Sequence, residues 1–275
     1  YQQLTLTKNQ DDLRLYLNRV IQFSSRDEYR YHEALALVPA AIAKPVNRAL
    51  ILGGGEGLLA RELLKLPEAT QIDIVDLDQR VFDLAVSQAQ LRQMNKEALT
   101  NPRVTTHAMD AGVFLESDTT LYDLIIADLP DPGNESLARL YSNWFFRLAR
   151  ARLRPGGVFA TQATSPYHST DAFWCITTTL EDSGFSGVYP YHINVPSFGD
   201  WGFVMATTQQ ETDVMKFRKD VPTKYLDNNL LPTLFYFPRD ISRPEGIGIN
   251  RLDRPVLLDY FLADWGSWQR DEPVQ

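Results

Sequence analysis

The sequence has 275 residues, of which 44% are hydrophobic, with a formal net charge of −8 and an isoelectric point near 5.1. This composition favours a soluble globular protein with a large core, and its acidic balance disfavours a nucleic-acid partner.

One cysteine excludes an internal disulfide framework, and the four histidines do not cluster at metal-ligand spacing. We therefore expect no metal and a reducing, cytoplasmic setting. The longest apolar stretches, such as 34–43, are too short to cross a bilayer.

The N-terminal residues alternate between apolar and polar side chains as in a β-hairpin. Leu4 and Leu6 belong to one run and the leucines of 13–17 to the next, separated by the turn-like segment 8–12. We expect a small β subdomain over 1–26. The start at Tyr1 rather than Met, inside this pattern, suggests a fragment whose missing part carried a targeting or membrane segment.

A helical pattern begins at Asp27 and stops at Pro39, and strand and helix patterns then alternate up to about Ala206. The predicted strands lie near 48–53, 72–76, 103–107, 123–128 and 157–162, and the predicted helices near 57–66, 79–90, 137–153 and 170–183. This alternation indicates an α/β fold with a parallel, doubly wound sheet over 27–206. Residues 207–275 combine helix and loop patterns, and we expect a C-terminal extension whose aromatic residues pack on the central domain.

A glycine-rich turn follows the first strand of the predicted sheet. Residues 48–57 combine an apolar strand with Gly53, Gly54, Gly55 and Gly57, and the next strand ends in Asp76. Glycines let the backbone approach a ligand, and a carboxylate about 20 residues further on accepts hydrogen bonds from ribose hydroxyls. The pattern predicts a nucleoside site; the alternative is a tight turn that only packs helix against strand. A nicotinamide dehydrogenase is disfavoured because the glycine spacing differs.

Polar residues also end the later strands, at Asp110, Asp128 and Gln162. Because ligands of open α/β sheets bind beyond the carboxyl ends of the strands, we expect these side chains to converge on one crevice. Asp128 and Asp131 lie on a proline-stiffened loop that suits an amine or another cation. The alternative for this loop is an Asx turn with a helix N-cap. The segment 154–157 predicts a helix-stopping turn before a strand.

These motifs, in this order, resemble the spermidine synthases, or polyamine aminopropyltransferases, over roughly residues 1–206. The resemblance is carried by Tyr1-Gln2, 20–22, 26–33, 53–57, 76–78, Asp110-Ala111, Asp128 with Asp131-Pro132, Gln162, 195–198 and 201–203. Three further segments look most like the soluble domain of bacterial members fused to a membrane region: 128–132, 164–167 and 250–253. The resemblance implies a Rossmann-like fold of the S-adenosylmethionine-dependent methyltransferase type, with 27–206 as the catalytic domain. It also suggests a homodimer that uses the hairpin and the tail aromatics as its interface.

By this resemblance, decarboxylated S-adenosylmethionine would be a co-substrate, with no tightly bound cofactor. Asp76 would bind the ribose hydroxyls, Glu56 would meet the aminopropyl ammonium group, and an acidic residue there disfavours a ligand that retains its carboxylate. The remaining nucleoside-binding residues would be Gln2, Gly53, Gly54, Gly55, Asp110 and Ala111, with Gln22 also lining the site.

A polyamine nitrogen is protonated at neutral pH and must lose a proton before it attacks the carbon bound to sulfonium. The resemblance implies Asp128 as general base, with the Tyr31 hydroxyl orienting the same nitrogen and Asp131 holding the amine for in-line attack. The other residues assigned to the amine are Gln22, His32, Gln162 and Phe198. The products would be methylthioadenosine and a longer polyamine, spermidine if the acceptor is putrescine.

Glu56 stands where the family usually has aspartate, and two further departures weaken the assignment of the acceptor amine. Phe198 replaces a tyrosine that contacts the amine, and Thr164 replaces an acidic residue that helps receive the far ammonium group. Glu181 and Asp200 are candidates to compensate. Putrescine is the first choice of acceptor, with cadaverine, diaminopropane or a longer amine as alternatives. The competing functions are an amine N-methyltransferase that uses intact S-adenosylmethionine, and a catalytically silent domain that senses polyamine or nucleoside.

Overall fold

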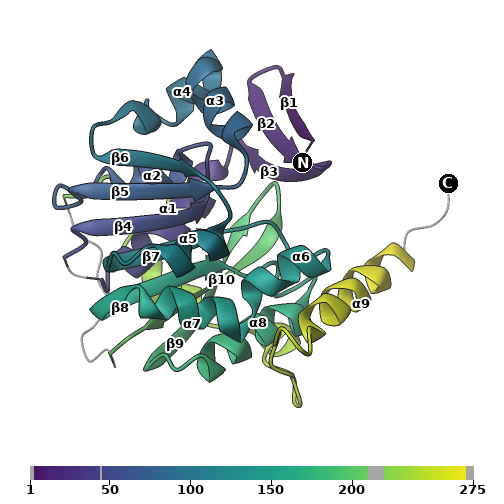
Figure 1. The fold of residues 1–275 in the computed structure, drawn as a ribbon. Helices are drawn as coiled ribbons and strands as arrows, with labels where there is room; N and C mark the ends of the chain where they lie inside the picture. The colour runs from purple at the N-terminus through teal and green to yellow at the C-terminus, as the bar shows by residue number, and fades with distance from the viewer. Residues whose placement is uncertain (1–2, 44, 210–219, 271–275) are drawn as a thin grey trace.

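The computed structural model describes the backbone of residues 3–43, 45–209 and 220–270, and the side chains of the last segment up to Gly266. Seven strands form a central sheet in the order β6-β5-β4-β7-β8-β10-β9, and a separate antiparallel sheet has the order β1-β2-β3 (Figure 1). The strands of the central sheet are β4 (Arg48–Gly53), β5 (Gln71–Asp76), β6 (Val104–Ala108), β7 (Tyr122–Asp128), β8 (Leu153–Gln162), β9 (Gly187–Val195) and β10 (Gly199–Thr207). The small sheet consists of β1 (Leu4–Asn9), β2 (Asp12–Leu17) and β3 (Val20–Ser24).

The strands from β6 to β8 are parallel, which confirms the predicted α/β fold, but β9 and β10 are antiparallel. The sheet is therefore mixed rather than wholly parallel. Strand β9 was not predicted from the sequence, because Pro190 interrupts its strand pattern. A proline is tolerated there because β9 is the edge strand of the sheet and pairs with β10 alone.

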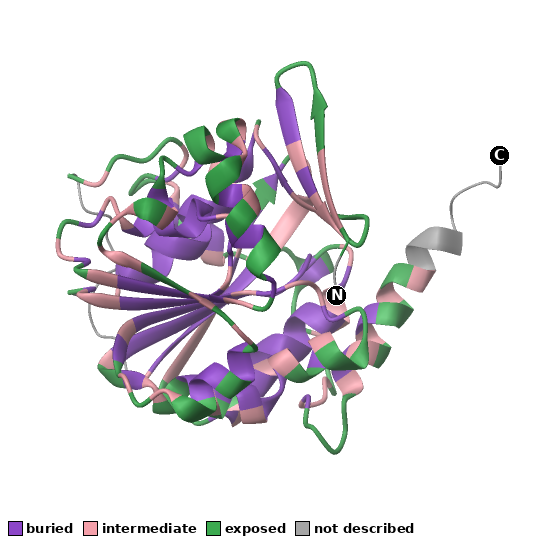
Figure 2. Cartoon of the chain, turned by 45° about the horizontal axis from the view of Figure 1, so that its top comes forward, coloured by how far each residue is buried: buried purple, intermediate pink, exposed green. Residues whose placement is uncertain are grey.

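Helices cover both faces of the sheet, as its alternating side chains require. Along β4, Ala49 and Ile51 belong to the core beneath α1 and α2, whereas Leu50 and Leu52 belong to the core beneath α5, α7 and α8. Figure 2 shows the central strands buried along most of their length. The helices are α1 (Glu28–Ala40), α2 (Leu58–Leu63), α3 (Gln79–Ser87), α4 (Ala89–Met94), α5 (Ala111–Ser117), α6 (Glu135–Ala138), α7 (Asn143–Ala151), α8 (Thr170–Asp182) and α9 (Val256–Arg270). Short 3-10 turns occur at η1 (Ala98–Thr100), η2 (Arg139–Tyr141), η3 (Leu231–Phe235) and η4 (Arg239–Ile241).

Three local predictions were wrong. The helix expected over 79–90 is divided between α3 and α4, because Gln88 is extended and its side chain caps α4. The helix expected over 137–153 is divided into α6, η2 and α7, because Ser142 is extended and its side chain accepts from the Phe145 amide. The segment 154–157 lies inside β8 rather than before it, since Leu153 already pairs with Tyr122.

The small sheet packs beside the central domain rather than standing free. Leu13, Leu15 and Phe23 share a buried cluster with residues of α2, α3 and α4. The segment after residue 219 is also attached: the buried Glu33 carboxylate of α1 accepts hydrogen bonds from the backbone amides of 224–226. The N-terminal element is a three-stranded sheet rather than the expected hairpin, because β3 pairs with β2. The division into three parts, with boundaries at 26 and 206, stays a prediction. Within the described residues, none of the helices combines the length and apolarity needed to cross a bilayer.

The ends of β4 and β7 approach so closely that only glycine fits between them. Gly53 has φ +86°, and a Cβ atom there would lie 1.9 Å from the carbonyl oxygen of Asp128. We expect Gly53→Ala to lower the free energy of unfolding by about 3 kcal/mol, because it adds a backbone clash to left-handed strain. Urea denaturation measures this loss.

Gly246 provides the matched control, because it has φ +76° but no atom within 4 Å of the position that a Cβ would occupy. Gly246→Ala should cost about 1 kcal/mol, from the left-handed conformation alone. Equal losses in the two variants would contradict the close approach of the two strand ends.

Candidate active site

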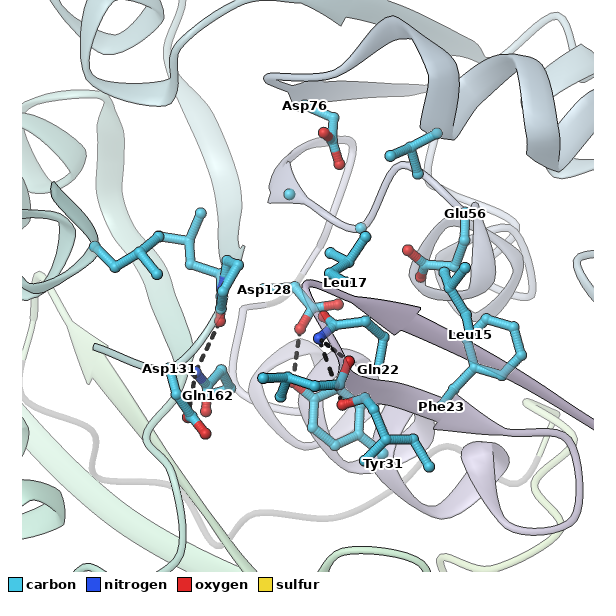
Figure 3. A pocket seen from close by; sticks show the side chains of 18 of the residues that line it. Leu15, Leu17, Gln22, Phe23, Tyr31, Glu56, Asp76, Asp128, Asp131 and Gln162 are labelled. Carbon is cyan, nitrogen blue, oxygen red and sulfur yellow. Dashed lines mark hydrogen bonds between the residues drawn. The ribbon is translucent and has the colours of Figure 1, made fainter. Parts of the chain in front are cut away.

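A cavity of about 350 Å³ lies at the carboxyl ends of the parallel strands and extends under β2 and β3 (Figure 3). Most residues that the sequence assigned to a site line it: Gln22, Tyr31, His32, Gly53, Gly54, Glu56, Asp76, Asp110, Ala111, Asp128, Asp131, Gln162 and Phe198. Gly55 is not among the lining residues, but its amide contacts Asp76. Gln2 lies outside the described residues. The polar side chains at the strand ends therefore converge, as their positions predicted.

The glycine-rich turn fixes the carboxylate of Asp76. The Asp76 side chain accepts hydrogen bonds from the Gly55 and Asp78 amides, both at 3.1 Å. A Cβ atom on Gly55 would lie 2.8 Å from Asp76 Oδ2, so the turn approaches this side chain as closely as glycine permits. Burial raises the pKa of Asp76, and the Glu56 charge adds to this, while the two amides oppose it. Asp110 is also fixed, because it caps α5 by accepting from the Val113 amide.

The acidic loop after β7 is anchored by side chains beneath it. Gln162 is 2% exposed, and its amide nitrogen donates to the Leu129 carbonyl at 2.7 Å and to Asp131 Oδ1 at 3.3 Å. The Tyr141 hydroxyl contacts the Leu129 and Pro130 carbonyls, both at 3.0 Å. The interpretation of this loop as a helix N-cap is wrong, because Asn134 caps α6 instead. The loop thus holds its two carboxylates toward the cavity.

Asp128 and Asp131 both have raised pKa values. Burial is the main cause at Asp128, reinforced by the charge of Glu56, and the result is a pKa of about 6. Burial also raises the pKa of Asp131 to about 6, against the opposing hydrogen bond from Gln162. The Tyr31 hydroxyl donates to Asp128 Oδ1 at 2.6 Å (Figure 3). Because burial and the Asp128 charge raise the pKa of Tyr31, this phenol stays protonated and acts as a donor.

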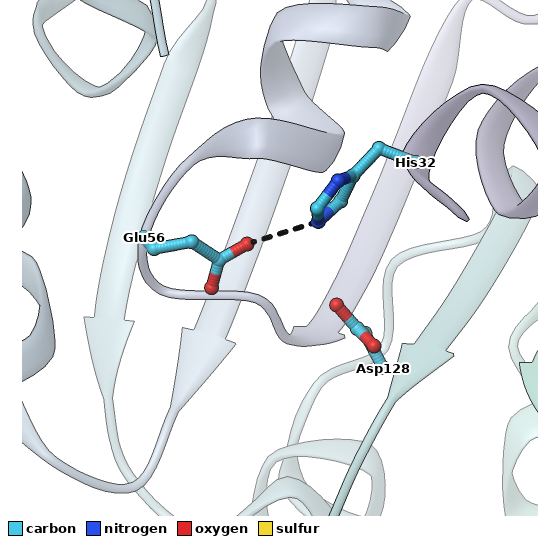
Figure 4. A group of neighbouring side chains, drawn as sticks. All are labelled: His32, Glu56 and Asp128. Atoms are coloured by element: carbon cyan, nitrogen blue, oxygen red, sulfur yellow. Dashed lines mark ion pairs between the residues drawn. The ribbon is translucent and has the colours of Figure 1, made fainter. Parts of the chain in front are cut away.

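A series of buried charged side chains, in contact with one another, ends at Glu56. Arg61 donates to both oxygens of Glu28, each at 2.8 Å, and Glu28 Oε2 lies 2.9 Å from Nδ1 of His32. Nε2 of His32 is 3.7 Å from Glu56 Oε1 (Figure 4). Burial opposes protonation of His32, but the hydrogen bond to Glu28 and the negative charges of Glu28 and Glu56 outweigh it and raise the pKa to about 10. The imidazole is therefore cationic at neutral pH and orients Glu56.

His32, Glu56 and Asp128 also bring potential metal-ligand atoms within 4.8 Å of one another. The sequence did not indicate this group, because it contains one histidine and two carboxylates from separate segments. A histidine that binds a metal must have a neutral imidazole ring, whereas the raised pKa of His32 favours the protonated ring. The group thus presents two carboxylates and one cation to the cavity, an arrangement that suits an organic ammonium group better than a metal ion.

Aromatic rings form the cavity wall next to Asp128. Phe198 packs edge-on against Tyr31 with ring centroids 5.9 Å apart, and it contacts Trp201 at 5.2 Å. The turn that carries Phe198 is fixed because Asp27 accepts from the amide and hydroxyl of Ser197. This contact connects the β9–β10 turn to the start of α1. It places Phe198 beside the Tyr31 ring.

Neither proposed replacement for an acidic residue at Thr164 lines the cavity. Glu181 forms an ion pair with Arg243 at 2.8 Å, and Asp200 pairs with His192 at 2.7 Å. The suggestion that these carboxylates compensate at the far end of the pocket was wrong. Glu181 lies in α8 and Asp200 in β10, and the sequence did not show in which direction either side chain points.

Sequence reasoning missed several residues of the site. Leu15 and Leu17 form part of the cavity wall, although the hairpin pattern indicated only their strand. The Arg61–Glu28 ion pair was missed because its partners are far apart in the chain. Trp265 of α9 also lines the cavity, whereas the sequence predicted it to be a packing residue. The signal available for Trp265 was weak, since it lies in a segment with little periodicity.

The fold and the site define an α/β domain with a glycine-rich turn after β4 and an adjoining acidic pocket. Two solved structures share this fold: a spermidine synthase in complex with the transition-state analogue AdoDATO, and spermidine synthase from Thermotoga maritima. The TM-scores are 0.77 and 0.75, each at 21% identity; 97% of this chain is covered in both cases, with 85% and 84% of those chains.

The spermine/spermidine synthase domain matches residues 28–219, and the chain belongs to this family. It is 42% identical over 265 residues to "Polyamine aminopropyltransferase 2" of Ralstonia nicotianae, covering 96% of this chain and 52% of the relative. It is 40% identical over 269 residues to "Polyamine aminopropyltransferase" of Mycobacterium tuberculosis, covering 96% and 50%. The chain thus spans about half the length of the curated relatives that it matches. The resemblance found in the sequence is confirmed.

The raised pKa of Asp128 predicts a stability penalty in the ligand-free protein. Between about pH 4 and pH 6 the folded protein binds more protons at this site than the unfolded chain, so stability falls as pH rises through this window. Asp128→Asn removes the titration and keeps an acceptor for Tyr31. We expect this variant to be more stable than wild type by about 1 kcal/mol at pH 7.5, with a smaller gain at pH 5.

Urea denaturation at both pH values measures this difference. Glu116→Gln is the control, because Glu116 is exposed on α5 and outside the cavity. A gain for Asp128→Asn that is the same at pH 5 and pH 7.5 would show that titration of Asp128 is not its cause.

Proposed function

We propose that this chain transfers the aminopropyl group of decarboxylated S-adenosylmethionine to an amine, with Asp128 as general base. The observation that carries the proposal is the contact between Tyr31 and Asp128 in a cavity that also contains Glu56 and Asp76. A base, an orienting hydroxyl, a carboxylate for the aminopropyl group and a carboxylate for ribose are thus within one space. The family membership supports the same reaction.

The nucleoside would lie across the glycine turn formed by Gly53, Gly54 and Gly55. Asp76 would accept from the ribose hydroxyls, because its oxygens are directed by two backbone amides. Asp110 and Ala111, which begin α5, would contact the adenine. Gln22 of β3 also lines the cavity, and we assign it to binding of the nucleoside and the amine. The role of Gln2 in binding the nucleoside stays a prediction, because Gln2 lies outside the described residues.

Glu56 would bind the ammonium group of the aminopropyl chain. Its Oε1 atom is buried and lacks a hydrogen-bond partner, although cationic His32 lies 3.7 Å away. A buried carboxylate oxygen in this state gains from an added donor. Intact S-adenosylmethionine would bring its own carboxylate to this position, where Glu56 and Asp128 would repel it. This charge pattern favours aminopropyl transfer over methyl transfer.

The reaction begins with removal of a proton from the attacking ammonium nitrogen by Asp128. The freed lone pair then forms a bond to the methylene carbon attached to sulfur, and the carbon–sulfur bond breaks. Its electron pair goes to sulfur, which changes from a sulfonium to the neutral thioether of methylthioadenosine. The raised pKa of Asp128, about 6, makes it a stronger base than an ordinary carboxylate while it stays mostly ionised at pH 7.

Asp131 and Gln162 would position the acceptor amine. His32 was also assigned to the amine, but its cationic ring would repel an ammonium group, so we propose that it acts by positioning Glu56. Asp131 supplies a second carboxylate near the attacking nitrogen, and Gln162 fixes both that carboxylate and the loop backbone. Phe198 contributes a ring but no hydroxyl at this wall. Putrescine is the proposed acceptor, which gives spermidine as the product. The homodimer, the membrane fusion and the cytoplasmic location stay predictions.

Product formation from putrescine and either decarboxylated or intact S-adenosylmethionine tests the proposal. We expect methylthioadenosine and spermidine from the decarboxylated substrate, with kcat reduced about 10²- to 10⁴-fold in Asp128→Asn, because general-base catalysis contributes a factor of this size. Asp131→Asn should mainly raise the KM for the amine. Glu116→Gln should match wild type.

Formation of S-adenosylhomocysteine from the intact substrate would instead identify a methyltransferase. Binding of the nucleoside without turnover across a panel of diamines would contradict catalysis and favour a sensor domain. Full activity of Asp128→Asn would remove Asp128 from the role of base while leaving the transfer reaction in place.

A further inference from the structure

Helix α9 contributes a residue to the cavity although it lies far beyond the matched family domain. That domain ends at residue 219, whereas Trp265 belongs to α9 and lines the cavity together with Asp128 and Asp131. Its side chain is 36% exposed, so one part of the indole is left open to solvent. Trp265 has no part in the proposed chemistry. Its position therefore needs a separate explanation.

Helix α9 is fixed against the body of the protein. Leu257 and Phe261 are buried in the same core as residues of α8. One turn further along, the Asp264 carboxylate accepts from the Ala172 amide in the first turn of α8, at 3.3 Å. The adjacent residue, Trp265, is thus held by contacts on the preceding turns. Figure 1 shows α9 beside α8 along this part of the chain.

Contacts around Trp265 place it at the amine end of the cavity. Its ring stacks on His168 with centroids 6.0 Å apart and an interplanar angle of 18°. A Cβ atom on Gly199 would lie 3.6 Å from His168 Nε2, so His168 borders the turn that carries Phe198. Phe261, on the same helix, lies beside Gly133 at the end of the acidic loop. Trp265 therefore lies between the acidic loop and the Phe198 turn.

We infer that Trp265 is a specificity-determining residue that forms the outer wall of the amine site and contacts the far end of the acceptor with the ring face that is not stacked on His168. This inference rests on the proposed function. Asp128 and Asp131 would both bind the end of the acceptor amine that reacts. Glu181 is ion-paired with Arg243 and Asp200 with His192, outside the cavity, so neither would bind the far end of the amine. Aromatic faces bind ammonium groups, and indole does so best. Trp265, with Phe198 and Trp201, would receive the distal ammonium group in place of a carboxylate.

The test compares Trp265→Ala and Trp265→Phe with Leu262→Ala. Leu262 is the matched control, because it lies on α9, is 55% exposed and does not line the cavity. Loss of one cation–aromatic contact should raise the KM for putrescine about tenfold in Trp265→Ala and about twofold in Trp265→Phe. The wider opening should also improve the relative use of longer amines such as cadaverine. Affinity for methylthioadenosine should not change in any variant.

Calorimetric titration of putrescine into each variant saturated with methylthioadenosine gives a second measurement that needs no turnover. If wild type has no transferase activity but binds putrescine about tenfold more tightly than Trp265→Ala, the proposed function fails and the inference holds. An acceptor KM and affinity within twofold of wild type in Trp265→Ala would overturn the inference. Equal weakening of methylthioadenosine and putrescine would also overturn it, because it would assign a general structural role to Trp265.

Discussion

The accumulation of carboxylates around one partly buried cavity is the constraint on which the site depends. Burial raises the pKa values of Asp76, Asp128 and Asp131, and the charge of Glu56 adds to this effect at Asp76 and Asp128. The ligand-free protein therefore bears an electrostatic cost at neutral pH. His32 supplies one compensating positive charge, which the Arg61–Glu28 pair stabilises. A cationic ligand relieves the remaining cost. The carboxylates that lower stability therefore make the cavity electrostatically suited to a cation, which is the basis of the proposed binding of a sulfonium and an ammonium group.

The topology explains how residues distant in the sequence reach this cavity. Parallel strands end at one edge of the sheet, and β4 lies between β5 and β7, so the glycine turn adjoins both Asp76 and the acidic loop. Gly53 allows the closest approach, because any side chain there would meet the Asp128 carbonyl. The antiparallel pair β9 and β10 then brings Phe198 over the Tyr31 ring. The fold of the backbone thus determines which side chains meet in the site.

The sequence predicted the parallel strands and the glycine-rich turn because both have local signals: apolar runs, glycines and polar residues at strand ends. It also indicated the residues that meet in the cavity, although their individual roles stay predictions. It did not show the Arg61–Glu28–His32 chain, since an ion pair between α1 and α2 leaves no periodic pattern. The place of Trp265 was missed for a related reason. Helix α9 reaches the cavity through tertiary contacts, among them the hydrogen bond between Asp264 and α8, which leave no local pattern in the sequence.

The central claim is that the cavity selects a cationic aminopropyl group and rejects a carboxylate. Isothermal titration calorimetry of wild type and Glu56→Gln with decarboxylated and intact S-adenosylmethionine tests it most directly. The account predicts that wild type binds the decarboxylated form at least about tenfold more tightly, a difference of about 1.4 kcal/mol, and that Glu56→Gln narrows the gap. Equal or tighter binding of the intact form by wild type would contradict it.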